Sequence, residues 1–409
     1  MISGNGAPVR ISCRGVWKIF GPDPKHALER IDLGMDKDQV AEATGHVLAV
    51  KDVSFDVTEG EVFVVMGLSG SGKSTLIRCL NRLIEPTTGE IEVDGVDISR
   101  LSKSELRMLR RHKVCMVFQH FALLPHRTVI DNVAYGLEVQ GMPKAKRHDK
   151  AAEMIEMVGL KGWEDNYPDE LSGGMQQRVG LARSLAIEPE IMLLDEAFSA
   201  LDPLIRRQMQ DEFINLMSKV KKTIVFITHD LNEALKMGDR IAIMKDGEIV
   251  QLGTPEEIVS TPADDYVTEF VRDVPLSKVV QVKSVMRWPE VMLYGWQGPK
   301  VALHAMSRQD VNHALVVDRA GKFRGSVSLD EVRHAAQTGI TRLDQMELDE
   351  TVRINPDQSL DDAVPLAATS GKPIAVVDDD GGLIGEVPHV ALLMGMAGQE
   401  NGQEESPPS

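Results

Sequence analysis

The sequence has few aromatic residues, few cysteines and a deficit of positive charge. Only 4% of the residues are Phe, Trp or Tyr, so aliphatic side chains must fill the hydrophobic cores. The three cysteines, Cys13, Cys79 and Cys115, form no CxxC pair and no zinc-ligand spacing, which is typical of a protein of the reducing cytosol. The formal net charge of −17 argues against binding of nucleic-acid phosphates and predicts repulsion from an anionic bilayer.

Long apolar runs are also absent. No stretch reaches the roughly 18 apolar residues of a membrane-spanning helix, and the first residues, MISGNGAPVRIS, lack the apolar part of a signal peptide. We therefore expect a cytosolic protein that reaches a membrane only through a protein partner. The chain has 409 residues, 43% of them hydrophobic and 26% charged, which is enough for two or three globular domains.

Short apolar runs alternate with helical patterns from residue 10 to about residue 260. Helix-length segments such as KSTLIRCLNRL separate these runs, so we expect an α/β domain over residues 1–265. The runs show no polar alternation, which is typical of parallel strands covered on both faces. They are EVFVVM (61–66), VCMVF (114–118), IMLLD (191–195), IVFIT (224–228) and IAIM (241–244).

Beyond a proline-containing linker over residues 266–278, the sequence repeats itself with a period of 60 residues. The segment ALVVDRAGKFRGSVSLDEV (314–332) aligns with IAVVDDDGGLIGEVPHVAL (374–392). Each copy predicts a strand, a glycine-bearing turn, a second strand and a helix, and repeated units usually bury their open faces on each other. We expect a smaller α+β module over 279–398, followed by a disordered acidic tail over 399–409.

The most informative segment is GLSGSGKST (67–75), which we call the glycine-rich segment. It follows a predicted strand and begins a predicted helix, so its backbone N–H groups can surround phosphate oxygens at a positive helix terminus. Lys73 supplies a charge for the β and γ phosphates, and Ser74 supplies a hydroxyl ligand for Mg²⁺. A flexible Gly/Ser turn is the alternative, but the flanking strand and helix favour a nucleoside triphosphate site.

Polar residues follow three other predicted strands. Asp195 ends the run IMLLD and Glu196 follows it, so that one carboxylate can hold Mg²⁺ while its neighbour polarises an attacking water. Taken alone, this acidic pair is equally compatible with a helix cap. His229 follows IVFIT and Gln119 follows VCMVF, and each looks ordinary in isolation. Because the carboxyl ends of parallel strands share one edge of a sheet, we expect these residues to converge on the nucleotide.

With LSGGMQQR (171–178), SALD (199–202) and THD (228–230) in this order, the chain resembles the ATP-binding subunit of an ATP-binding-cassette (ABC) transporter over residues 10 to about 270. The resemblance implies a P-loop NTPase fold with a helical subdomain over about 100–180, and hydrolysis of ATP to ADP and phosphate with Mg²⁺. It implies catalytic roles for Glu196, His229 and Gln119, and Mg²⁺ ligation by Ser74, Gln119 and Asp195. The residues that it implies contact ATP are Phe20, Gly67, Ser69, Gly70, Ser71, Gly72, Lys73, Ser74, Thr75, Ser172, Gly173, Gly174 and Asp202. Trp17 is the alternative to Phe20 for stacking on adenine. Met175 stands where the family usually has glutamine.

The signature SGG begins the predicted helix MQQRVGLARSLA and is a second helix terminus suited to an anion. The family's arrangement is a head-to-tail homodimer, in which each ATP lies between one chain's glycine-rich segment and the other chain's signature. Closing and opening of the dimer would drive transmembrane permease subunits between inward-facing and outward-facing states. The resemblance therefore implies a peripheral location at the cytoplasmic face of the inner membrane, with residues 121–132 as the candidate permease contact.

A narrower resemblance points to bacterial importers of choline, glycine betaine and proline betaine. It rests on a helical insertion over about 21–46, which begins GPDPKHALERIDLG, and on NRLIEPTTGEIEVDG and FQHFALLPHRTVIDN. An inert surface helix is the alternative for the insertion. Methylated cations are usually held in aromatic cages, and with so few aromatic residues here we expect the cage on a separate substrate-binding protein. An importer of amino acids and a soluble ABC ATPase for DNA repair or translation are the competing functions; the net charge disfavours the second.

The C-terminal repeat resembles a tandem cystathionine-β-synthase-type (CBS) module. Such modules can bind adenine nucleotides through a hydroxyl and an acid after the second strand, positions that Ser328 and Glu331 occupy in the first copy. The second copy has Pro388 and Ala391 there, which puts its ligand site in doubt. The module could sense ionic strength through screening of charge, or it could be a passive dimerisation platform, and the sequence leaves these alternatives open.

Overall fold

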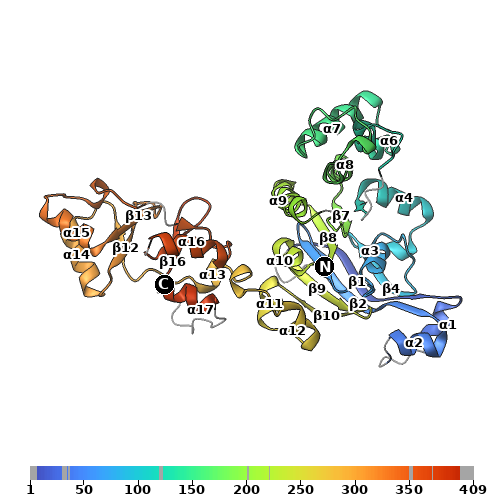
Figure 1. Ribbon diagram of the computed structural model, residues 1–409, viewed down its shortest axis with the longest axis horizontal. Coiled ribbons are helices and arrows are strands. Elements are labelled where there is room, and N and C mark those ends of the chain that lie inside the picture. Colours follow the sequence, from blue (N-terminus) through green and yellow to red (C-terminus); the bar gives the residue numbers. More distant parts are fainter. Residues whose placement is uncertain are drawn as a thin grey trace. The chain divides into compact units, whose positions relative to one another are not determined.

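The computed structural model describes residues 7–29, 35, 37–118, 123–199, 202–220, 222–349, 353–370 and 372–396. The chain divides after Val271 into two compact units, which we call the N-terminal unit (1–271) and the C-terminal unit (272–409). Figure 1 labels the helices and strands of both units. Within the described residues, no helix combines the length and the apolar character needed to cross a membrane.

A six-stranded sheet forms the centre of the N-terminal unit, in the order β10-β9-β3-β8-β7-β6. All neighbouring strands are parallel except the edge pair β9 and β10. Every residue of β7 and β8 is buried, as predicted for apolar runs covered on both faces. This confirms the predicted α/β fold. The strands are β3 (Val62–Met66), β6 (Val114–Val117), β7 (Ile191–Asp195), β8 (Thr223–Thr228), β9 (Arg240–Lys245) and β10 (Glu248–Gly253).

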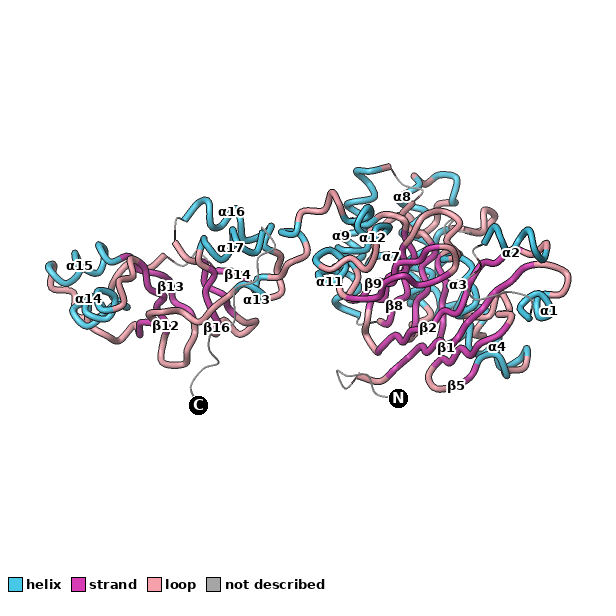
Figure 2. Tube along the Cα trace, turned by 90° about the horizontal axis from the view of Figure 1, so that it is seen from below, coloured by secondary structure: helices cyan, strands magenta, loops and turns pink. Residues whose placement is uncertain are grey.

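A second, antiparallel sheet has the order β2-β1-β4-β5 and packs against the first. Figure 2 shows its long pair β1 and β2 side by side. The core between the sheets includes stacked rings of Phe55 and Phe63, whose centroids are 4.8 Å apart. The apolar face of α3 also belongs to this core, through Leu76, Ile77 and Leu80. The strands are β1 (Val9–Phe20), β2 (Val47–Thr58), β4 (Thr88–Val93) and β5 (Val96–Asp97).

Several helices of the N-terminal unit form local groups. Figure 1 shows α6, α7 and α8 together, and α9 and α10 beside the six-stranded sheet. The insertion between β1 and β2 forms α1 and α2. The helices are α1 (Pro24–Glu29), α2 (Lys37–Thr44), α3 (Lys73–Leu80), α4 (Lys103–His112), α5 (Val129–Val133), α6 (Tyr135–Val139), α7 (Lys144–Met157), α8 (Gly173–Ala186), α9 (Pro203–Val220), α10 (Leu231–Met237), α11 (Pro255–Ser260) and α12 (Asp265–Val271), with 3-10 turns at Ile98–Arg100 and Pro168–Glu170.

The region 100–180 contains, besides its helices, β6, the strand that the run VCMVF (114–118) predicts. One expected segment differs in detail from the structure. The expected linker over 266–278 contains most of α12 and a 3-10 turn at Leu276–Lys278. A helical segment was missed here because two flanking prolines, at 262 and 275, suggested an irregular chain.

The C-terminal unit contains two three-stranded sheets, β11-β12-β13 and β14-β15-β16, each with one parallel and one antiparallel pair. The copies meet reciprocally: Phe323 donates its N–H to the carbonyl of Gly381 at 3.0 Å, and Leu383 to that of Gly321 at 3.1 Å. A shared apolar cluster joins Leu315 and Val317 of one copy to Ala375 and Leu383 of the other. The expected repeat is therefore built as two copies joined by a shared apolar cluster.

The elements of the C-terminal unit repeat in the same order. The strands are β11 (Met292–Tyr294), β12 (His313–Val317), β13 (Phe323–Ser328), β14 (Arg353–Ile354), β15 (Ile374–Val377) and β16 (Leu383–Val387). The helices are α13 (Val282–Val285), α14 (Pro299–Arg308), α15 (Leu329–Gln337), α16 (Leu360–Ser370) and α17 (His389–Met396), with a 3-10 turn at Leu343–Gln345. The tail over 399–409 lies outside the described residues.

Candidate active site

The glycine-rich segment lies between β3 and α3, in the strand–loop–helix context that the sequence predicts. Gly67, Gly70 and Gly72 have positive φ angles of 151°, 81° and 108°. A Cβ atom on Gly67 would lie 2.2 Å from the carbonyl oxygen of Met244, and one on Gly72 would lie 2.1 Å from that of Ala49. Glycine is therefore required at both positions for the backbone conformation and for close packing beside β9 and β2.

Lys73, the first residue of α3, folds its ammonium group back over the glycine-rich segment. Its Nζ donates hydrogen bonds to the carbonyl oxygens of Gly67 at 2.8 Å and Leu68 at 2.9 Å, and the residue is only 4% exposed. Burial lowers the pKa of Lys73, while the carboxylates of Glu196 and Asp195 act in the opposite direction. Because the cation is partly removed from water, its attraction for a phosphate oxygen is strengthened.

The remaining side chains of the glycine-rich segment also suit phosphate. Ser71 is buried, and its Oγ has no hydrogen-bond partner among the described residues. A buried hydroxyl without a partner is costly, so this atom fits a bound phosphate oxygen. Ser69 and Gly70 are exposed at the tip of the loop, and Thr75 is half-buried in the first turn of α3.

Ser74 and Asp195 meet although they are 121 residues apart in the sequence. Ser74 Oγ donates a hydrogen bond to Asp195 Oδ1 at 2.9 Å, and Arg78 Nη2 lies 3.0 Å from Asp195 Oδ2. Mg²⁺ prefers oxygen ligands and usually takes one or two from the protein, with phosphate and water completing the shell. The described residues hold no group of three or more His, Cys, Asp or Glu arranged for a metal. The contact between a serine hydroxyl and a carboxylate oxygen fits a Mg²⁺ ion that arrives with a triphosphate.

Glu196 and His229 lie at the same edge of the sheet, at the ends of β7 and β8. Glu196 Oε2 is 3.4 Å from His229 Nδ1, and the side chains are 17% and 49% exposed. Glu196 has a positive φ of 48°, and its N–H donates to the carbonyl of Ile227 at 3.2 Å. Positive φ is uncommon for residues other than glycine and clusters at functional sites. A carboxylate in this position can accept a proton from a water molecule.

The two candidates for an adenine-stacking ring differ in burial. Phe20, the last residue of β1, is 40% exposed, and the ammonium of Lys18 lies 4.8 Å from its ring centroid. Trp17 is 8% exposed and packs in a small core with Ile19 and Val40. The exposed ring of Phe20 is available to a ligand, whereas that of Trp17 is occupied by packing.

The signature residues occupy the start of α8. Ser172 caps the helix by accepting a hydrogen bond from Met175 N–H at 3.4 Å, and both Ser172 and Gly173 are exposed. A Cβ on Gly173 would meet nothing within 4 Å. In the described part of the chain, no hydrogen bond or ion pair joins Ser172, Gly173 or Gly174 to the glycine-rich segment. The structure thus leaves this helix start facing solvent within a single chain.

The remaining predicted positions are Asp202, Gln119 and Phe121. Asp202 is exposed just before α9, and its Oδ1 accepts a hydrogen bond from Leu204 N–H at 3.2 Å. Gln119 lies outside the described residues, as does Phe121, the first residue of the candidate permease contact.

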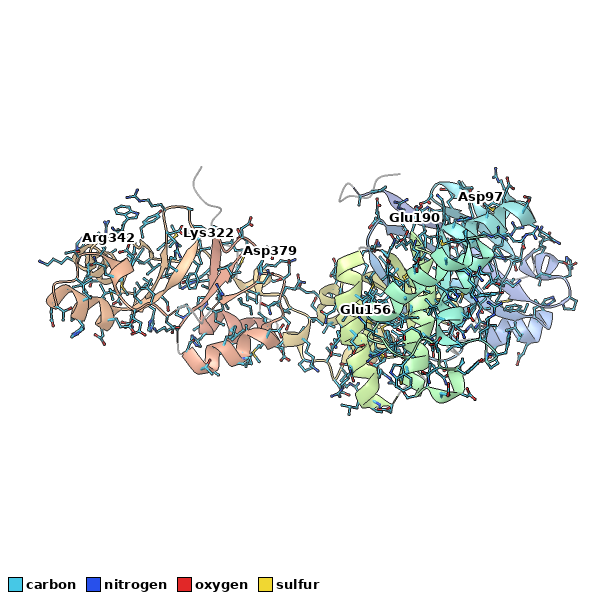
Figure 3. The ribbon with its side chains drawn as sticks, turned by 90° about the horizontal axis from the view of Figure 1, so that it is seen from above. Asp97, Glu156, Glu190, Lys322, Arg342 and Asp379 are labelled. Atoms are coloured by element: carbon cyan, nitrogen blue, oxygen red, sulfur yellow. The ribbon has the colours of Figure 1, made fainter. Side chains whose placement is uncertain are left out.

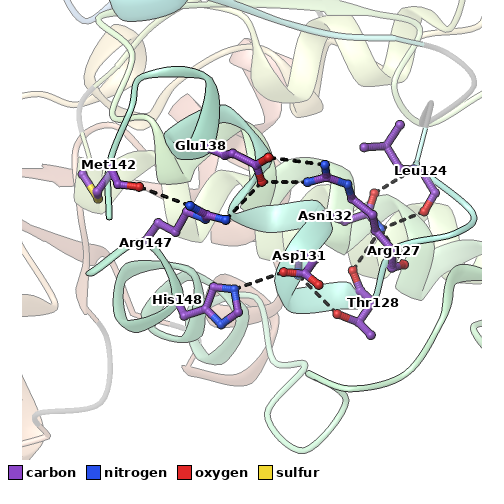
Figure 4. A network of polar contacts seen from close by, with 9 residues as sticks. All are labelled: Leu124, Arg127, Thr128, Asp131, Asn132, Glu138, Met142, Arg147 and His148. Carbon is purple, nitrogen blue, oxygen red and sulfur yellow. Dashed lines mark hydrogen bonds and ion pairs between the residues drawn. The ribbon is translucent and has the colours of Figure 1, made fainter. Parts of the chain in front are cut away.

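The described part of that candidate contact is organised by a buried amide that the sequence did not reveal. Asn132 is fully buried; its Oδ1 accepts from Leu124 N–H at 2.7 Å, and its Nδ2 donates to the carbonyls of Leu124, Arg127 and Thr128. Figure 4 shows this amide beside the ion pair between Arg127 and Glu138, whose atoms are 2.8 Å apart. A single asparagine in the short helix α5 carries no motif, so only the tertiary contacts identify it.

An apolar groove of about 700 Å³ lies between α7, α8 and α9. We call it the α7–α9 groove. Acidic side chains also line it, among them Glu156, which Figure 3 labels. Its apolar lining includes Val117, Met157, Leu181, Met209, Phe213 and Leu216.

Comparison with known proteins identifies the family to which the chain belongs. Residues 50–199 match the family model of ABC transporters, and residues 271–338 match that of the CBS domain. The glycine betaine transport ATP-binding protein OpuAA of Bacillus subtilis is 48% identical over 391 residues, which cover 96% of this chain and 93% of OpuAA. The chain belongs to the ATP-binding subunits of ABC transporters. It is therefore an ATPase, as its sequence motifs predict.

Two further relatives bear on this ABC ATPase. The trimethylamine N-oxide transport system ATP-binding protein TmoW of Ruegeria pomeroyi is 57% identical over 282 residues, covering 69% of this chain and 82% of TmoW. A solved dimeric structure of the ATP-binding cassette MJ0796, in a post-hydrolysis state bound to ADP and Pi, aligns with a TM-score of 0.51 and 33% identity. It covers 60% of this chain and 98% of the cassette.

Proposed function

We propose that this ABC ATPase powers the uptake of a quaternary ammonium osmolyte: choline, glycine betaine or proline betaine. The likeness to OpuAA carries the proposal, because it extends over 96% of the chain and so includes both units. TmoW is more similar in sequence but covers only 69% of the chain, which makes trimethylamine N-oxide the second candidate substrate. The relatives described above are named for transport of glycine betaine and trimethylamine N-oxide, which favours these substrates over an amino acid.

In the proposed mechanism, the glycine-rich segment and Lys73 bind the phosphates of ATP while the exposed ring of Phe20 stacks on adenine. Mg²⁺, held by Ser74, Asp195 and Gln119, would neutralise charge on the β- and γ-phosphate oxygens. Support comes from the 2.9 Å contact between Ser74 and Asp195 and from the unpartnered hydroxyl of Ser71 among the described residues.

Glu196 is the proposed general base, which accepts the proton of the attacking water. The imidazole of His229, 3.4 Å from its carboxylate, is proposed to orient the same water and to respond to the γ-phosphate. The positive φ of Glu196 supports a functional position, since the backbone conformation sets its carboxylate at the sheet edge beside His229.

A second copy of the chain completes the proposed site. Its Ser172, Gly173 and Gly174 would donate to the phosphates from the exposed start of α8, and Asp202 would lie at the dimer interface. The exposure of this helix start in one chain supports the proposal, as does the dimeric state of the related cassette MJ0796.

The proposed partners at the membrane are permease subunits, with a separate substrate-binding protein that holds the osmolyte. The chain would then lie peripherally at the cytoplasmic face of the inner membrane. The α7–α9 groove offers an apolar surface of the kind that a short permease helix can fill. One of its lining residues, Val117, is two residues before Gln119 in the sequence. Together with residues 121–132, this groove is the proposed docking surface.

The substrate is tested by reconstituting the chain in proteoliposomes with candidate permease and substrate-binding proteins from the same genome. ATP hydrolysis is measured with choline, glycine betaine, proline betaine, trimethylamine N-oxide and amino acids. We expect stimulation by one or more quaternary ammonium compounds. Stimulation by an amino acid alone would show that the substrate assignment is wrong.

The docking surface is tested with a matched pair of exposed methionines. Met157 lines the α7–α9 groove and is 47% exposed, whereas Met108 lies on α4 and is 51% exposed. Met157→Asp is expected to reduce co-purification with the permease while ATP binding is retained, and Met108→Asp is expected to leave both unchanged. Equal recovery of permease with both variants would place the contact elsewhere.

A further inference from the structure

The insertion between β1 and β2 is anchored to the body of the N-terminal unit by its own small core. Ala27 of α1 and Val40 of α2 are 2% and 0% exposed, and they pack with Ile19 and Leu48 of the strands on either side. Lys51 of β2 also donates a hydrogen bond to the carbonyl of residue 35 at 3.3 Å. The start of α2 is thus held from two sides, which gives its first side chain a defined position.

That first side chain is Lys37, and it contacts the glycine-rich segment. Its Nζ donates a hydrogen bond to the carbonyl oxygen of Gly70 at 2.6 Å, and the residue is half-buried. Lys73 binds two other carbonyls of the same loop, those of Gly67 and Leu68. Two ammonium groups, one from the insertion and one from the motif, therefore hold three carbonyl oxygens of one loop.

The two ammonium groups are close enough to interact. The charge of Lys37 is among the causes that lower the pKa of Lys73, after burial, which is the largest. Burial also lowers the pKa of Lys37, and the carboxylate of Asp246 acts in the opposite direction. Two neighbouring cations repel each other across the loop, and an anion bound between or beside them offsets that repulsion.

We propose that Lys37 is a nucleotide-affinity residue contributed by the insertion, whose ammonium group adds to the positive field that attracts the phosphates of ATP. The inference rests on the proposed nucleotide site and extends it to a residue outside every motif of the sequence. Because the effect is electrostatic, it grows with the number of phosphates and weakens as salt is added. A purely structural hydrogen bond to Gly70 would show neither dependence.

The test compares nucleotide binding to the full-length chain and four variants. Dissociation constants for ATP, ADP and AMP are measured with Mg²⁺ at low and high salt, and melting temperatures confirm that each variant folds. Lys37→Met removes the charge, and Lys37→Arg keeps it. Lys25→Met removes an exposed lysine from α1 of the same insertion and is the matched control. Lys73→Ala tests the phosphate site itself.

Lys37→Met is expected to weaken ATP binding about five- to tenfold, as for one charge–charge interaction near a protein surface, with smaller losses for ADP and AMP and a shallower salt dependence. Lys37→Arg is expected to restore most of the affinity, and Lys25→Met to match the wild type. If Lys37→Met binds ATP normally while Lys73→Ala does not, the inference is wrong and the proposed site stands. If neither variant changes binding, the proposed site is wrong. Equal losses in Lys37→Met and Lys37→Arg, with an unchanged salt dependence, would also overturn the inference.

Discussion

The two units use similar polar residues in different ways. In the N-terminal unit, Ser74 and Asp195 contact each other across 121 residues, and Glu196 and His229 meet from neighbouring strands. In the C-terminal unit, Ser328 and Glu331 are three residues apart and bond to each other's backbone. Ser328 N–H donates to Glu331 Oε2 at 2.6 Å, and Glu331 N–H donates to Ser328 Oγ at 3.2 Å.

The second arrangement is a capping box, which satisfies N–H groups at the start of α15 that have no partner inside the helix. It accounts for both side chains without any ligand. In the N-terminal unit, no local requirement explains why a serine hydroxyl, a buried aspartate and an arginine meet at the end of β7. Polar contacts between distant segments at a sheet edge therefore indicate chemistry more strongly than contacts three residues apart.

The sharpest test of this contrast is Glu196→Gln, for which we expect the largest effect. Loss of the general base should lower the turnover of ATP by about 10²- to 10⁴-fold, because the amide cannot accept the proton of the attacking water. ATP should still bind, and a closed dimer should accumulate with ATP, which size-exclusion chromatography detects. Turnover near that of the wild type would contradict the role of Glu196.

Lys73→Ala is expected to act on binding. Removal of a charge-assisted hydrogen-bond donor should weaken ATP binding by about 10- to 100-fold, as measured by titration calorimetry. Lys283→Ala, a change at an exposed ion pair of the C-terminal unit, is the control and should leave ATP binding unchanged. If Lys73→Ala bound ATP with wild-type affinity, Lys73 would not be part of the phosphate site.

Ser328→Ala tests the capping interpretation and should have a smaller effect. Loss of an N-cap side chain should destabilise the C-terminal unit by about 1 kcal/mol, while ATP turnover stays the same. Thermal unfolding followed by circular dichroism measures the first quantity. If the variant keeps its stability but loses a response to added adenine nucleotides, Ser328 belongs to a ligand site and the contrast between the units disappears.

Deletion of the C-terminal unit should have the smallest effect on hydrolysis, because the glycine-rich segment, Asp195 and Glu196 all lie in the N-terminal unit. We expect ATP turnover of residues 1–271 within about twofold of the full chain. The informative readout is the dependence of transport on salt. A changed dependence supports the charge-sensing alternative, and an unchanged one supports the passive platform.

Much of the fold was predictable because it depends on patterns among residues that are close together in the sequence. The five apolar runs are strands of the six-stranded sheet, and the 60-residue repeat forms two copies of one topology. The motifs also identified the family, which the comparisons confirm. The helix α12 was not predicted, since the prolines on either side of it outweighed its short apolar pattern.

Parts of the site could not be read from the sequence. Nothing near Arg78 indicates that it contacts Asp195, and nothing near Lys37 indicates that it reaches Gly70. The choice between Phe20 and Trp17 depended on which ring the insertion covers, and the core of α1 and α2 covers Trp17. Each of these contacts joins segments whose meeting depends on the packing of whole elements.

The sequence by itself determined the kinds of element and the chemistry they carry: glycines where a loop must pass close to backbone, a lysine and hydroxyls for phosphate, and carboxylates at the end of a buried strand. The tertiary structure alone decided which of these groups meet, which ring stays exposed, and that Ser328 and Glu331 form a capping box at the start of a helix. The physical reason is the distance along the sequence over which each interaction acts. Backbone conformation and periodicity depend on adjacent residues, whereas a contact between residues 37 and 70, or 74 and 195, depends on how the sheets and the insertion pack together.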